Sequence, residues 1–368
     1  RRDGEVQANL VTSLQLGADG RVLAGIYGDI SQRDAVFVAP GFDFRAGNQR
    51  VDIDGVVIAQ PDSSAASENP PVILKAAATT SVTSRMVQAD AGDAGSLTYD
   101  LIEIRLSELA FMRDQQGRIR LRAEPSIRVT SPTVSGPLAF ETNRLDVGFT
   151  SLDASLNGAS AEVRADGTVR LSNADVTLPA GAEDSAPTSI RTGPVETTLG
   201  TMAISHAPEQ THVTGQIALE IDELVATAAL PAGEGEVSIG PMNADLSDLD
   251  LLVSQEGLGF GGALALNLDE VGLTAPDAQG ATMTASLGSV DTRLEDLALA
   301  LDPAGQPSAS GQLALGLAEI AAEIPLVDGT ASITAPAFDI SLDDVAVEQS
   351  DEQMSLSASG RVALTGLA

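Results

Sequence analysis

One pattern constrains the fold of this chain more than any other: a strand-like stretch that recurs at a nearly fixed interval. Six stretches of the form Gly-x-aliphatic-x-Leu begin at Gly117, Gly167, Gly215, Gly262, Gly311 and Gly360. The last four start 47, 49 and 49 residues apart, with sequences such as GQIALEIDEL and GQLALGLAEI. Alternation of apolar and polar residues is typical of a half-buried β-strand, and self-similarity at a fixed period indicates a repeat architecture.

A second pattern precedes each of these stretches. LSDLDL, LEDLAL and LDDVAV begin at Leu246, Leu294 and Leu342, each 48 residues after the last. Their apolar residues stand at i, i+3 and i+5, which breaks the alternation and predicts a β-bulge or a strand boundary. The two patterns are separated by turn-rich segments and read as β-hairpins. With a third apolar stretch, we expect three or four short strands per repeat, each repeated glycine opening a strand.

These features predict an all-β chain: an elongated, repetitive antiparallel β structure, curled into a groove, with repeats of about 48 residues. A β-helix is the alternative, because two coils of about 24 residues would give the same period. A helix over 243–254 is a further local alternative. Residues 1–100 are expected to form an irregular β-rich segment, and residues 101–368 about six repeats in one array.

Alternation places the aliphatic residues of each repeated stretch on one face of the sheet and the acidic residues on the other. A sheet does not leave so large an apolar face in water, so we expect a second layer, a curl or an apolar ligand against it. The predicted lining residues are Ile119, Leu121, Val169, Leu171, Ile217, Leu219, Ile221, Leu264, Leu266, Leu268, Leu313, Leu315, Leu317, Val362 and Leu364.

Charge and composition limit the function. The formal net charge is −32, and only two of the 20 basic residues follow residue 191. Such a field repels phosphate backbones, so nucleic acid is not an expected partner. The chain has no cysteine, which excludes disulfides and thiolate chemistry. No apolar run is long enough for a membrane-spanning helix. Since the chain begins with Arg1 and Arg2, we expect a processed or truncated piece whose anchor lies upstream.

The repeated stretches GRIRLRAEPSI, DGTVRLSNADV and GQLALGLAEI, without Cys or Trp, resemble the AsmA-like and TamB-like envelope proteins of Gram-negative bacteria. The resemblance covers residues from about 100 to 368 and rests on the repeated strand pattern rather than on a motif of specific residues. It implies a non-enzymatic periplasmic or cell-envelope protein whose aliphatic groove carries phospholipid acyl chains between membranes. Envelope proteins would contact its ends, and the missing anchor would contact the membrane.

A basic cluster interrupts the acidic chain. Arg118, Arg120 and Arg122 alternate with Ile119 and Leu121, so their side chains share a face. This cluster is a candidate for binding anionic headgroups or an acidic partner. The alternative is a set of salt bridges to Glu103, Glu108 and Glu124 on neighbouring strands.

No enzyme motif meets its requirements, so no catalytic residue, metal site or cofactor is predicted. GLGFGG at 257–262 has the letters of a dinucleotide motif but precedes a repeat strand, and we interpret it as a turn. His206 and His212, with Glu209, are too sparse for a metal site or a triad. DIDG (52–55) and DAGDAG (90–95) complete no calcium loop. The rival function is a secreted or cell-surface stalk or adhesin, β-helix-like and calcium-stabilised.

Overall fold

The computed structural model describes residues 6–18, 21–61, 72–114, 116–136, 138–179, 188–230, 232–277, 279–303, 305–326, 329–350 and 353–365. These residues are almost entirely β-strand, with one short 3-10 helix, η1 (Gly92–Ala94). Neighbouring strands pair in antiparallel ladders. The predicted all-β, repetitive antiparallel structure is therefore confirmed. The chain divides into two compact units, the first built mainly from residues before 171 and the second mainly from residues after 208.

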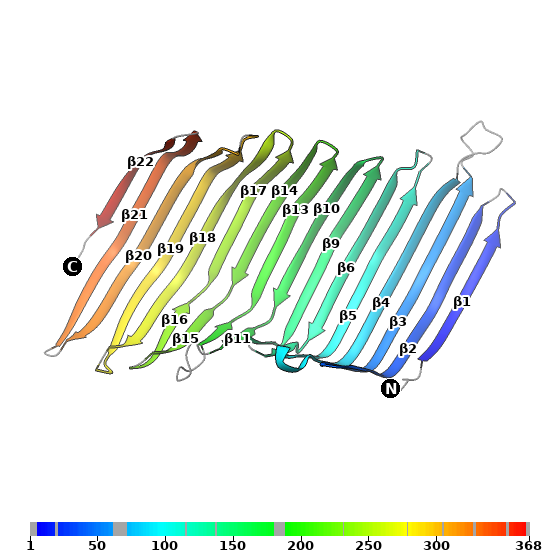
Figure 1. The fold of residues 1–368 in the computed structure, drawn as a ribbon, viewed down its shortest axis with the longest axis horizontal. Helices are drawn as coiled ribbons and strands as arrows, with labels where there is room; N and C mark the ends of the chain where they lie inside the picture. The colour runs from blue at the N-terminus through cyan, green and yellow to red at the C-terminus, as the bar shows by residue number, and fades with distance from the viewer. Residues whose placement is uncertain are drawn as a thin grey trace. The chain divides into compact units, whose positions relative to one another are not determined.

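The first unit is a ladder in which strands follow one another in sequence order. Strand β1 pairs with β2, β2 with β3, and so on to β5, β6 and β9. Figure 1 shows these strands side by side, from blue to green. The strands with residues in this unit are β1 (Val6–Leu16), β2 (Val22–Ala39), β3 (Phe42–Pro61), β4 (Val72–Asp90), β5 (Ser96–Arg113), β6 (Ile119–Thr130), β7 (Thr133–Ser135), β8 (Ala139–Thr142), β9 (Arg144–Asn157), β10 (Ser160–Leu171) and β13 (Val195–Ala207).

The second unit repeats this arrangement. Strand β14 pairs with β17, and β17 to β22 then pair in sequence order. The strands that lie wholly in this unit are β11 (Ala174–Leu178), β12 (Thr188–Thr192), β14 (Gln210–Ile221), β15 (Leu224–Leu230), β16 (Gly233–Ile239), β17 (Met242–Ser254), β18 (Gly257–Pro276), β19 (Thr282–Leu301), β20 (Pro307–Leu326), β21 (Gly329–Ser350) and β22 (Gln353–Thr365). Strands β8, β10 and β13 contribute residues to both units.

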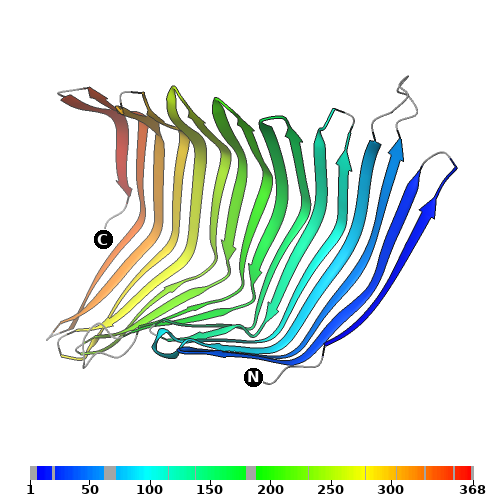
Figure 2. The same ribbon diagram turned by 45° about the vertical axis from the view of Figure 1, so that its right-hand side comes forward.

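The repeats that begin at Gly262 and Gly311 form two long strands each, not the three or four short ones expected. The preceding repeat does form four short strands, β14 to β17, of 12, 7, 7 and 13 residues. Strands β18 to β20 have 20 residues each and β21 has 22. In these two repeats the expectation was wrong because the irregular positions bend a strand without ending it. Figure 2 shows the long yellow and orange strands curving along their length. The helical alternative for 243–254 is also wrong, since these residues lie in β17.

The irregular positions are bulges, which was one of the two alternatives that the i, i+3, i+5 spacing left open, and not strand boundaries. Asp248, Asp296 and Asp344 have positive φ angles of 52°, 51° and 53°. At each of them the pairing register with the next strand shifts. A bulge inserts a residue and so restores the aliphatic residues that follow to their original face. Aspartate tolerates the left-handed conformation better than most residues, which accounts for its recurrence at these sites.

The bulges explain why glycine recurs at these positions of the repeat. Gly262 and Gly311 lie inside strands, opposite the bulge of the preceding strand, so the prediction that they open strands is wrong. A Cβ on Gly262 would lie 3.3 Å from the carbonyl oxygen of Ser247, and one on Gly311 would lie 3.3 Å from that of Glu295. The bulged backbone comes so close that a side chain here is crowded.

The N-terminal region differs from the irregular segment expected for residues 1–100. Strands β2, β3 and β4 have 18, 20 and 19 residues. Alanine, serine and threonine occupy many of their positions and weaken the alternation in the sequence, although the ladder is regular. The β-helix alternative fails because the ladders are antiparallel and join strands consecutive in sequence.

Candidate functional site

The second unit gathers the predicted lining residues on one face. Residues that pair across a ladder share a face, so the registers align them in rows that cross β14, β17, β18, β19, β20, β21 and β22. The first row is Ile217, Leu246, Leu264, Leu294, Leu313 and Leu342. The second is Leu219, Ala244, Leu266, Thr292, Leu315, Ile340 and Val362. The third is Ile221, Met242, Leu268, Val290, Leu317, Phe338 and Leu364. We call these three rows the aliphatic face.

Sequence reasoning found half of this face. The residues that it missed, among them Leu246, Leu294 and Ile340, come from the other strand of each hairpin. Their alternation is visible in the sequence, but the register that sets them beside Leu264 and Leu315 is not, because pairing joins residues far apart in the chain.

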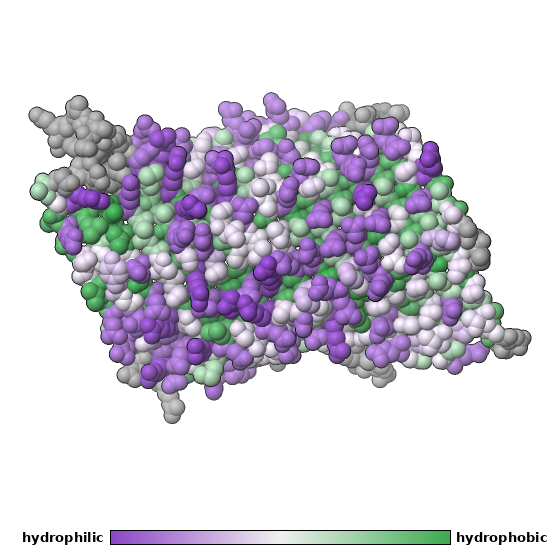
Figure 3. Space-filling model, turned by 180° about the vertical axis from the view of Figure 1, so that it is seen from behind, coloured by the Kyte–Doolittle hydropathy of each residue, from purple (hydrophilic) through white to green (hydrophobic). Residues whose placement is uncertain are grey.

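The opposite face of the same strands is polar or small. One row there consists of Ala218, Asp245, Ala265, Arg293, Ala314, Ser341 and Arg361. Alternation along each strand therefore separates the aliphatic side chains from the charged ones. Figure 3 shows one side of the molecule, where hydrophilic side chains stand in bands with hydrophobic ones between them.

Nothing among the described residues covers the aliphatic face. Val362 and Leu364, on the last strand of the ladder, are 66% and 53% exposed. The other members of the three rows are half-buried, and no large side chain of the described residues is fully buried. The accessible surface is 22688 Å², whereas a compact protein of this mass exposes about 14,000 Å². The chain thus presents single β layers with large apolar areas in contact with solvent.

The first unit has an aliphatic face of its own. One row on it crosses seven strands: Ala8, Ile30, Val51, Val82, Ile104, Ile127 and Val147. The predicted lining residues Ile119 and Leu121 share this face through the alternation of β6. Val169 and Leu171 lie half-buried on β10, and Leu171 falls within the range of the second unit.

The predicted basic cluster lies on the other face of β6. Arg118 pairs with Asp114, with 2.6 Å between Nε and Oδ2. Arg120 and Arg122 have no ion pair among the described residues, so the predicted salt bridges to Glu103, Glu108 and Glu124 do not form there. Their side chains alternate with that of Leu121 along β6 and so point to the other face.

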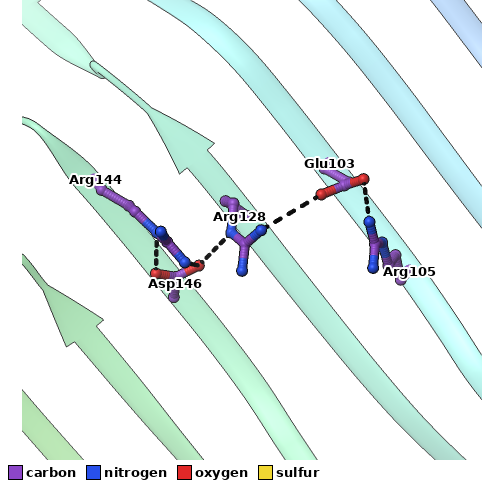
Figure 4. A network of polar contacts seen from close by, with 5 residues as sticks. All are labelled: Glu103, Arg105, Arg128, Arg144 and Asp146. Carbon is purple, nitrogen blue, oxygen red and sulfur yellow. Dashed lines mark hydrogen bonds and ion pairs between the residues drawn. The ribbon is translucent and has the colours of Figure 1, made fainter.

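Five charged residues farther along the same polar face do form a network (Figure 4). Arg105 binds Glu103 at 2.6 Å, and Arg128 lies 3.8 Å from Glu103 and 2.8 Å from Asp146. Arg144 also binds Asp146. Burial, the largest single influence, raises the pKa of Asp146, but hydrogen bonds and charge from Arg144 and Arg128 outweigh it and hold that pKa below its usual value. The network links β5, β6 and β9.

The remaining motifs have structural roles. GLGFGG forms the first residues of β18 and not the predicted turn, which occupies 255–256. His212 pairs with Asp250 at 2.9 Å. Asp52 accepts hydrogen bonds from Arg50, and Asp90 accepts one from the backbone N–H of Gly92. Within the described ranges, no group of three or more His, Cys, Asp or Glu residues is placed to hold a metal ion.

No family model, curated protein or solved structure matches the chain. The part of the chain that the structure describes contains no helix that is long and apolar enough to cross a membrane. The aliphatic face and the cation-lined polar face are therefore the features from which a function has to be argued.

Proposed function

We propose that this chain is a non-enzymatic protein of the Gram-negative cell envelope whose aliphatic face carries or shields the acyl chains of phospholipid between membranes. The observation that carries the proposal is the alignment of leucine, isoleucine and valine in three adjacent rows across the second unit, without a covering layer among the described residues. The resemblance to AsmA-like and TamB-like proteins, which led to the expected periplasmic location, agrees with it.

The energetics favour acyl chains as the occupant. An apolar face that extends over seven strands and stays partly exposed costs free energy in water and marks a site of interaction. Transfer of one CH₂ group from water to apolar surroundings gains about 0.8 kcal/mol. A 16-carbon chain buried on one side would thus gain on the order of 6 kcal/mol, half of the value for full burial. No single residue is decisive, because the rows offer equivalent contacts from strand to strand.

The face also suits movement along the ladder. Strands are spaced about 4.8 Å apart, and each strand presents an aliphatic side chain at nearly the same level as its neighbour. An acyl chain that shifts by one strand exchanges one leucine contact for another of similar size. A surface of repeated, shallow contacts therefore holds a lipid without trapping it at one position.

The alternative function, a stalk or adhesin with a closed β-helix interior, has less support. A closed interior would bury its aliphatic side chains on all sides, and the described residues form single antiparallel layers instead. The suggested calcium stabilisation lacks support as well, because Asp52 of DIDG and Asp90 of DAGDAG hydrogen-bond to neighbouring protein groups.

The test is lipid extraction and mass spectrometry of the chain purified from bacteria in mild detergent. We expect phospholipid at a stoichiometric level on the parent chain. The Leu266→Asp, Leu315→Asp double variant places two carboxylates on the aliphatic face and should lose it. The matched control, Ala265→Asp, Ala314→Asp, adds the same charge to the same two strands on the opposite face and should keep the lipid.

Circular dichroism would show that both double variants are folded. Absence of lipid from the parent chain, or equal loss from both variants, would refute the proposal. Equal loss would mean that added charge alone, on either face, displaces the lipid.

A further inference from the structure

A cavity of about 770 Å³ opens on the first unit, over strands β3 to β6, β9 and β10. On the outer strands its lining alternates, with Val56 and Ile58 of β3 and Glu162 and Arg164 of β10, which places it on the polar face. On the strands between them it also includes consecutive residues, among them Ala76, Phe111, Leu121 and Ala154. Its volume falls in the range of small-molecule sites, which are typically apolar with a few polar groups.

The ladder registers place apolar and cationic side chains side by side in this cavity. One row is Ile58, Lys75, Met112 and Arg120, and the next is Val56, Ala77, Ala110 and Arg122. Val56, Ile58 and Met112 are half-buried, whereas Lys75, Arg120 and Arg122 are exposed. The polar face is thus largely apolar at this level, with three cations among its aliphatic side chains.

A few residues farther along the same strands, the arginines of this face are paired with carboxylates. There Arg105 and Arg128 bind Glu103 and Asp146 in the network of Figure 4. In the cavity Lys75, Arg120 and Arg122 have no ion pair among the described residues, although the chain carries 52 acidic residues. The cavity therefore offers positive charge that no ion pair within the described ranges neutralises.

Two carboxylates also line the cavity. Glu162 is bound to Arg164 at 2.6 Å, so this pair neutralises itself. Asp153 stands opposite Arg122 in the register but makes no ion pair within 4 Å of it. The balance is three free cations against one carboxylate, which favours a ligand with negative charge. Guanidinium groups match the planar oxygens of carboxylate and phosphate especially well.

We propose that this cavity binds a single-chain anionic amphiphile, an alkyl carboxylate or alkyl phosphate. Its alkyl chain packs against Val56, Ile58 and Met112, and its oxyanion lies among Lys75, Arg120 and Arg122. A polyanion such as nucleic acid is disfavoured by the net charge of −32, whereas a small ligand with one charged group meets little of that repulsion. The site lies in the first unit, on the face to which Arg120 and Arg122 point, and does not depend on the proposed role of the aliphatic face of the second unit.

The test is isothermal titration calorimetry of the whole chain, purified without detergent, with dodecyl phosphate below its micellar concentration. Inorganic phosphate and the uncharged dodecyl maltoside are the comparison ligands. We expect saturable binding of dodecyl phosphate, with at least tenfold weaker binding of the other two. Binding of inorganic phosphate with equal affinity would reduce the cavity to a simple anion site, and equal binding of the maltoside would reduce it to an apolar one. Either result, obtained on the unmodified chain alone, overturns the proposal.

Two double variants then locate the site. Arg120→Gln, Arg122→Gln should weaken dodecyl phosphate binding at least tenfold. Arg105→Gln, Arg128→Gln removes the same charge from the same face of β5 and β6, outside the cavity, and should leave the affinity unchanged. An equal effect of both would indicate binding to overall charge and contradict the assignment.

A third variant separates this proposal from the proposed function. Leu266→Asp, Leu315→Asp should keep dodecyl phosphate binding even where it abolishes the retention of phospholipid. Loss of dodecyl phosphate binding in this variant would place the amphiphile on the aliphatic face and overturn the cavity assignment.

Discussion

The repeated glycines permit a sharp test of the close approach between strands. In strands β9 and β10 of the first unit, Gly148 and Gly167 are neighbours with opposite surroundings. A Cβ on Gly167 would lie 2.7 Å from the carbonyl oxygen of Gly148 and 2.9 Å from Cδ1 of Phe149. A Cβ on Gly148 would meet nothing within 4 Å. Gly167→Ala should therefore lower the free energy of unfolding, and Gly148→Ala should raise it.

The magnitudes follow from these distances. Ordinary Cβ contacts begin near 3.4 Å, so Gly167→Ala has to push the β9 backbone back by more than half an ångström. Overpacking of this kind costs about 1–3 kcal/mol. Gly148→Ala adds no contact and mainly restricts the unfolded chain, which stabilises by about 0.4–1 kcal/mol.

The assay is thermal unfolding of the whole chain, followed by circular dichroism and calorimetry. One kcal/mol shifts Tm by about 2–4 °C in units of roughly 150–250 residues. We expect Gly167→Ala to lower the Tm of the first unit by about 2–12 °C and Gly148→Ala to raise it by about 1–4 °C.

A Gly167→Ala variant as stable as Gly148→Ala would refute the reasoning. It would mean that the ladder opens without cost, and that close approach to the neighbouring backbone is not what keeps glycine at this position. The same result would weaken the explanation of Gly262 and Gly311, whose Cβ atoms would meet the backbone at 3.3 Å.

Three further predictions concern the bulges and the charge network. Asp248 has a φ of 52°, so Asp248→Val should destabilise by about 1–2 kcal/mol while Asp248→Gly changes stability by less than about 0.5 kcal/mol, as urea unfolding would show. Arg128 is 45% exposed and its two carboxylate partners each keep another arginine, so Arg128→Gln should cost no more than about 1 kcal/mol, an effect that shrinks in about 0.5 M salt. The pKa of Asp146 is lowered in the folded state, so its contribution to stability is present above the unfolded pKa of about 3.9 and is lost as pH falls through the lower folded value. Parent and Asp146→Asn chains should therefore differ in unfolding free energy at pH 6, and the difference should shrink as the pH is lowered below about 3.9. An unchanged difference would contradict the role of this carboxylate.

The alternation of GQIALEIDEL and its relatives determined much of this protein by itself. It fixed the strand class, the period and the faces of residues such as Leu266 and Leu315, because the direction of a side chain in a strand depends only on its position along that strand. The broken spacing of LSDLDL likewise marked an irregularity near Asp248, since a bulge shifts the alternation of its own strand, although it left open whether the strand bulges or ends there.

Only the tertiary structure decided how these strands meet. It paired Leu264 with Leu246 and Leu294 to complete a row, and it brought the bulged backbone against Gly262. It also separated paired from unpaired arginines: Arg128 meets Asp146 on β9, while Arg120 stands beside Met112 on β5. These outcomes depend on the pairing register between segments distant in sequence. The register is set by the pairing energy of the whole ladder, so it cannot be read from the sequence of one strand.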